Sequence, residues 1–138
     1  MNTIKRYGIW IIVIHSMILL VHKLAHLSLT IELSLQQRIV VVLIFILTPI
    51  ATLALLRTNR LQSGFLLLLL GMVAAFVFGV VNHFVFITED HVWHAPHGAM
   101  LPVFQVTAFL MAVVEAMGAL LGLWGLFQVT NRATNKTA

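Results

Sequence analysis

The chain has 138 residues, of which 61% are hydrophobic and only 9% are charged, and its mean hydropathy is +1.05. A soluble domain carries roughly 25% charged residues, so this composition indicates an integral membrane protein and excludes a soluble enzyme core. The net charge of +4 comes from basic residues in the gaps between apolar blocks, so we expect no nucleic-acid partner, and the absence of cysteine excludes thiolate metal ligands and thiol catalysis.

Four apolar blocks are long enough to cross a membrane. A helix needs about 20 apolar residues to cross the roughly 30 Å hydrocarbon layer, and such blocks occur at about 8–27, 39–56, 64–86 and 102–127. The gaps between them are short, as in an antiparallel bundle. The sequence therefore predicts an all-α protein: a single membrane domain over residues 1–138, folded as an antiparallel four-helix bundle with short loops and surrounded by the lipid bilayer.

The distribution of lysine and arginine orients this bundle. Only Lys23 and Arg38 lie near one end, and the other six lie at the opposite end: Lys5, Arg6, Arg57, Arg60, Arg132 and Lys136. Cytoplasmic segments are enriched in these residues. We therefore expect a multi-pass protein of a bacterial inner membrane with both termini in the cytoplasm, and residues 28–37 and 87–101 are then the outer connections.

Small residues recur at helical spacing in the last two blocks. Gly71, Ala75 and Gly79 follow one another every four residues, and Gly118 and Gly122 form a second pair with the same spacing. Small residues let helix backbones approach closely within a membrane. The pattern predicts close packing of the third and fourth helices.

Seven histidines are the main indication of function. On an α-helix, His15, His22 and His26 point within about 40° of one another, and the spacing of His22 and His26 allows both to bind one metal ion. His83 ends the third block at the same end of the bundle. The loop that follows it adds further candidate ligands, namely Asp90, His91, His94 and His97.

This set of residue types is typical of a transition-metal site. Imidazole and carboxylate ligands suit zinc, iron or copper(II). The sequence therefore predicts a membrane-embedded metal-binding protein, with a histidine-rich site at the outer end of the bundle, that acts in metal handling or redox chemistry. The predicted metal ligands are His22, His26, His83, Asp90, His91, His94 and His97. No substrate-binding feature is visible, so no catalytic residue is assigned.

Glu115 is the one acidic residue inside an apolar block. An isolated charge in hydrocarbon costs several kcal/mol, so this carboxyl group must be paired or protonated. His15 lies at a similar depth in the first block, and we predict that the two form a polar pair. The role of this pair is either to accept a proton or to join two helices by a hydrogen bond.

The histidines are also similar to those of two known groups of membrane proteins. Small four-helix b-type cytochromes hold haem between histidines of facing helices, and His22 or His26 with His83 resembles such an axial pair. That resemblance implies haem b, electron transfer and quinone as a partner. His22-Lys-Leu-Ala-His26 resembles the first histidine box of membrane hydroxylases, but no adjacent histidine pair exists here. A third alternative is a small structural or accessory subunit associated with other membrane proteins.

Overall fold

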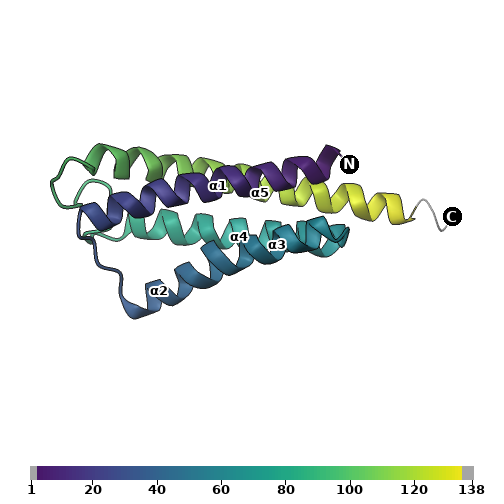
Figure 1. Ribbon diagram of the computed structural model, residues 1–138, viewed down its shortest axis with the longest axis horizontal. Coiled ribbons are helices and arrows are strands. Elements are labelled where there is room, and N and C mark those ends of the chain that lie inside the picture. Colours follow the sequence, from purple (N-terminus) through teal and green to yellow (C-terminus); the bar gives the residue numbers. More distant parts are fainter. Residues whose placement is uncertain (1–2, 135–138) are drawn as a thin grey trace.

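The computed structural model describes residues 3–134, and the chain is helical over most of that range (Figure 1). The first helix is α1 (Thr3–Ser28). The second segment joins α2 (Leu35–Val41), the π-helical η1 (Val42–Leu47) and α3 (Thr48–Arg57). The third joins α4 (Leu61–Val80) and the π-helical η2 (Val81–Val85), and the fourth is α5 (Leu101–Thr134). Lys136 lies outside the described residues.

All four segments are long and apolar enough to cross a membrane, so the predicted fold class is confirmed. The helices extend beyond several of the apolar blocks, because polar residues continue them past the hydrocarbon layer. The second segment, for example, begins at Leu35, where Ser34 and Gln37 form a capping box. The fourth block ends near residue 127 by hydropathy, whereas α5 continues to Thr134.

In the bundle α5 packs against both α1 and α4, and α3 packs against α4 and also contacts α1. The start of α1 and the end of α5 lie at the same end of the bundle (Figure 1). Lys5 lies at this end and donates a hydrogen bond to Asn59 at 2.8 Å. We call it the inner end, and the end that carries residues 29–34 and 86–100 the outer end. At the outer end, α2 diverges from the other helices (Figure 1).

The inner half of the bundle is densely packed. Its core contains Leu56 and Phe65, both fully buried. The predicted close approach of the last two spanning segments is confirmed, since a methyl group on Gly122 would lie 2.7 Å from the backbone nitrogen of Leu69, and one on Gly118 would lie 2.8 Å from the Met72 side chain. Glycine is therefore required where α5 crosses α4.

The outer half is closed by the connection between η2 and α5. Val92 donates a backbone hydrogen bond to the His83 carbonyl at 3.0 Å, and Gln105 donates its side-chain amide to the Val92 carbonyl at 2.8 Å. Val92 is itself fully buried, in a cluster with Phe104. The loop is thus fixed onto the helix ends, and this position turns Asp90 toward the bundle.

Candidate metal centre

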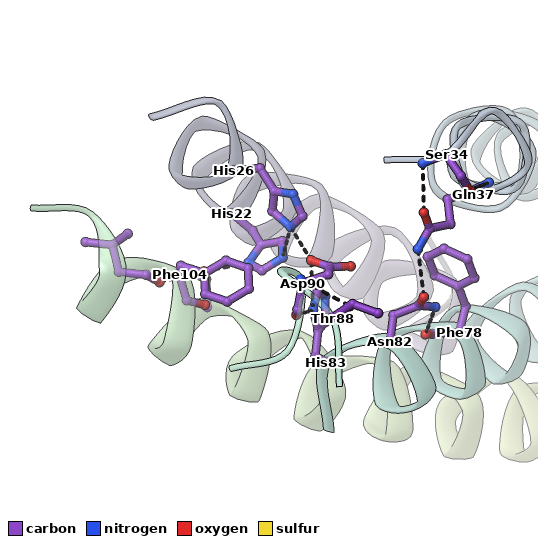
Figure 2. A network of polar contacts seen from close by, with 12 residues as sticks. His22, His26, Ser34, Gln37, Phe78, Asn82, His83, Thr88, Asp90 and Phe104 are labelled. Atoms are coloured by element: carbon purple, nitrogen blue, oxygen red, sulfur yellow. Dashed lines mark hydrogen bonds and ion pairs between the residues drawn. The ribbon is translucent and has the colours of Figure 1, made fainter. Parts of the chain in front are cut away.

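Three buried imidazoles meet at the outer end of the bundle (Figure 2). His22 and His26 come from α1 and His83 from η2, and each is at most 6% exposed. The Nε2 atoms of His22 and His26 are 3.1 Å apart, and the ring centroids of His22 and His83 are 4.9 Å apart. One ring nitrogen from each of the three lies within 4.8 Å of the others, so the group could hold a metal ion.

Asp90 adds a carboxylate to these imidazoles. Its Oδ1 atom lies 3.0 Å from Nε2 of His26 and 3.3 Å from Nδ1 of His83, and the residue is 5% exposed. Burial raises the pKa of the Asp90 carboxyl, but the imidazoles of His26 and His83 lower it by more, and the net pKa lies below the ordinary value. The group is therefore an anion at neutral pH, as a metal ligand must be.

Two of the spacings among these atoms are close to those around a tetrahedral ion, while the ring nitrogens of the three histidines lie within 4.8 Å of one another. Ligand atoms that lie about 2.0–2.1 Å from a tetrahedral zinc ion are about 3.3 Å from one another. The distances from His26 Nε2 to His22 Nε2 and to Asp90 Oδ1, 3.1 and 3.0 Å, are close to that value. The buried Oδ1 atom of Asp90 has the imidazoles of His26 and His83 as its ion-pair partners.

Two further contacts fix the tautomers of the histidines. The Thr107 hydroxyl donates to the Val103 carbonyl at 2.6 Å, so its oxygen accepts from Nδ1–H of His22 at 2.8 Å. In the same way, Nδ1–H of His83 donates to the Asp90 carbonyl at 2.9 Å. Both rings then keep a lone pair on Nε2. Hydrogen bonds of this kind orient histidines that bind metals.

His83 lies in a locally widened turn of its helix. The π-helical segment η2 contains Asn82 and His83, both buried, and π-helical turns are frequent at functional sites. Asn82 accepts a hydrogen bond from Gln37 at 2.9 Å and donates one to the Phe78 carbonyl at 2.7 Å (Figure 2). The residue next to His83 thus ties α2 to the centre.

The remaining predicted ligands lie elsewhere on the loop. His91 is buried, and its Nδ1 accepts a hydrogen bond from the Trp93 backbone at 3.2 Å. Its ring contacts that of His94, with centroids 4.9 Å apart, and His94 and His97 are exposed. None of these three belongs to the group formed by His22, His26 and His83. Successive turns of the loop direct Asp90 inward, and loop spacing alone does not predict such directions.

Sequence reasoning missed two residues of this centre. Thr107 orients His22, and Phe104 is fully buried against all three imidazoles, with centroid distances of 5.1, 5.2 and 5.6 Å. The sequence contains a signal for Thr107. It lies eight residues before Glu115 in α5, which is two steps of four residues, so the two side chains lie on one face of the helix. Phe104 had no such signal, since an aromatic residue in an apolar helix is unremarkable by sequence.

Two cavities lie beside the centre. A space of about 50 Å³ is bordered by the three histidines and Asp90, and also by Lys23 and Leu33. A larger cavity of about 480 Å³ shares His26, Lys23 and Leu33 with it and is also lined by Glu32 and Arg38. Both are lined by residues of α1 and of the chain from Leu33 onward.

The predicted partners His15 and Glu115 are in contact deeper in the bundle. His15 Nε2 lies 3.2 Å from Glu115 Oε1, and both side chains are almost completely buried. The ring of His15 stacks on Phe45, with centroids 5.8 Å apart. The pair is thus separate from the metal centre, although α1 contributes to both.

No protein-family model, curated protein or solved structure matches this chain.

Proposed function

We propose that this protein binds one divalent transition-metal ion of the zinc class within the membrane, through His22, His26, His83 and Asp90. The observation that carries this proposal is the convergence of three buried imidazoles and one buried carboxylate from three separate parts of the chain. Burial of such groups is costly unless they are satisfied. One cation satisfies all four at once.

Unsatisfied atoms argue against a purely structural role for the cluster. Only one proton can lie between the facing Nε2 atoms of His22 and His26. Oδ1 of Asp90 lies beside ring nitrogens of both His26 and His83, but within residues 3–134 neither contact has the geometry of a hydrogen bond. A network that served only to join helices would pair its buried polar atoms. The set is better explained as ligands that face a shared ion.

The packing of the rings favours a single ion over haem. Two axial histidines approach a haem iron from opposite faces, with a flat porphyrin between them. His22 and His83 instead lie edge to face at 4.9 Å, and the Phe104 ring packs against both. A porphyrin between these imidazoles would require the helices to separate.

The ligand set and the cavity favour metal capture over catalysis. A catalytic zinc site keeps an open position for water or substrate, whereas four protein ligands close the coordination sphere. The two cavities share Lys23, His26 and Leu33 in their linings, and an ion would reach the centre through them. In the predicted orientation, the protein would take up or hold metal ions at the outer face of the membrane.

Metal binding by purified protein tests the proposal. We expect about one zinc ion per chain by elemental analysis, and affinity lower by at least about a hundredfold in His22→Ala and His83→Ala, because each removes a ligand from a rigid helix. His97→Ala is the matched control, since His97 is exposed on the loop, and it should bind as the wild type does. Wild-type protein that binds no zinc, or a His22→Ala variant with unchanged affinity, would contradict the proposal.

A further inference from the structure

The pair formed by His15 and Glu115 is a second buried polar site that hydrogen bonding between helices does not explain. Glu115 is 0% exposed and His15 is 1% exposed, and Nε2 of His15 lies 3.2 Å from Oε1 of Glu115. The other polar atom of each side chain, Nδ1 of His15 and Oε2 of Glu115, has no hydrogen-bond partner in the described part of the chain. Unpaired polar atoms are costly within a membrane, so a purely structural pair would not retain two of them.

The number of protons on this pair determines its charge. With one transferable proton the pair is neutral overall, either as imidazolium and carboxylate or as imidazole and carboxylic acid. Loss of that proton leaves one negative charge in an apolar environment. Such a charge is stable only if a positive charge appears nearby.

The metal centre is the nearest place where a positive charge can appear. Helices α1 and α5 are antiparallel, and His22 contacts Thr107 just as His15 contacts Glu115. The two contacts are seven residues apart in α1 and eight in α5, so the sites are separated by about 10–12 Å. Phe45 stacks on His15 and also borders the cavity at the metal centre, so an apolar ring lies between the sites.

Few other charges act on the pair from the elements around it. His22 lies above it on α1, and η2 contributes His83, with which Glu115 interacts electrostatically. Asp90 follows on the outer loop. The side of His15 toward α3 borders a cavity of about 10 Å³ that is also lined by the hydroxyl residues Thr48 and Thr52. The described ionisable groups on these elements are therefore those of the metal centre, together with Lys23 of α1, which borders the same cavity.

We propose that His15 and Glu115 form a proton-binding site that gives up its proton when a metal ion binds at the outer centre. This inference rests on the proposed function. A divalent ion held by three neutral imidazoles and the Asp90 carboxylate retains one positive charge. When the pair releases one proton to water, its remaining negative charge balances that excess. The cavity beside His15 has the volume of about one water molecule, and it gives the proton a first acceptor.

The expected size of this coupling follows from the distance. Two unit charges about 10 Å apart, at an effective dielectric constant of about 20, change a binding constant by roughly tenfold. Removal of the Glu115 charge should therefore weaken zinc binding by about that factor. It should also leave the four ligands in place.

Proton release during zinc binding tests the proposal. Calorimetric titration at pH 7 in two buffers of different ionisation enthalpy gives the number of protons released per zinc ion. We expect Glu115→Gln to release one proton fewer than the wild type and to bind about tenfold more weakly. Glu115→Asp keeps the carboxyl group and should behave as the wild type. Glu89→Gln, which removes an exposed acid, should release as many protons as the wild type. If Glu115→Gln does not fold, His15→Gln should show the same loss, because it removes the other member of the pair.

The outcomes separate the two proposals. If the variants bind zinc and release as many protons as the wild type, the proton-binding site is refuted and the metal site stands. If the wild-type protein binds no zinc, the proposed function fails, and the coupled proton site fails with it.

Discussion

The two halves of this bundle are built from the same four spanning segments but differ in how their interiors are filled. At the inner end, glycines of α5 lie against the α4 backbone and large side chains such as Phe65 are completely buried. At the outer end, the π-helical segment η2 widens its helix, and histidines and cavities occupy the interior. Close packing in the inner half fixes the positions of the helices. In the outer half, helices in these positions bring polar side chains together.

This difference explains how a small membrane protein supports buried polar groups. Close helix packing in lipid relies on small residues because no hydrophobic force draws helices together. The glycine contacts of α4 and α5 fix the two helices that flank the metal centre. Each half can therefore be disturbed separately, and the following predictions begin with the largest expected effect.

Removal of the Asp90 charge should affect the outer half most. We expect Asp90→Asn to weaken zinc binding by about a hundredfold, or roughly 3 kcal/mol, because a buried charged partner of the ion is lost. Its neighbour Glu89 is exposed, so Glu89→Gln should bind zinc normally. Competition titration with a chromophoric chelator measures both, and equal losses would mean that burial of Asp90 is irrelevant to binding.

Loss of the Thr107 hydroxyl should have the next largest effect. In Thr107→Val, Nδ1–H of His22 loses its acceptor, and the ring is no longer held in the tautomer that presents Nε2. Such supporting hydrogen bonds typically change metal affinity by about 10–100-fold. Thr107→Ser keeps the hydroxyl and should restore the affinity. The same titration would reject the role of Thr107 if the valine variant bound as tightly as the wild type.

A methyl group at Gly122 should disturb the inner half. The new carbon would lie 2.7 Å from a backbone atom of Leu69, which cannot move aside, so we expect Gly122→Ala to lower the free energy of unfolding by about 1–3 kcal/mol. Gly79→Ala is the control, because its methyl group would meet Glu115 Oε2 at an ordinary 3.5 Å. Unfolding in mixed detergent micelles measures the difference. Equal free energies of unfolding for Gly122→Ala and Gly79→Ala would show that the inner half can accommodate a methyl group between α4 and α5.

The smallest effect concerns pH and the metal-free protein. The pKa of Asp90 is lowered in the folded state, so this carboxylate contributes stability that is fully present above its ordinary pKa of about 3.9 and is lost as the pH falls toward the lowered value. Unfolding measured between about pH 6 and pH 2 should therefore show a steeper loss of stability in the wild type than in Asp90→Asn. Parallel curves would contradict the folded-state interaction of Asp90.

The sequence predicted much of the fold and part of the centre. Apolar block length determines the four helices, and the four-residue step from His22 to His26 places both imidazoles on one face. The loop was harder to predict. Spacing gave equal weight to Asp90, His91, His94 and His97, but tertiary hydrogen bonds to the ends of η2 and α5 decide that Asp90 points inward. Such long-range contacts leave no periodic pattern in the sequence.

The most direct test of the central claim is X-ray absorption at the zinc edge of the metal-loaded protein. If His22, His26, His83 and Asp90 surround one ion, the first shell should contain four nitrogen or oxygen atoms at about 2.0–2.1 Å, with outer-shell scattering from three imidazoles. This scattering should fall to two imidazoles in His83→Ala and stay at three in His97→Ala. A first shell of water oxygens without imidazole scattering, or loss of scattering in His97→Ala alone, would contradict the account.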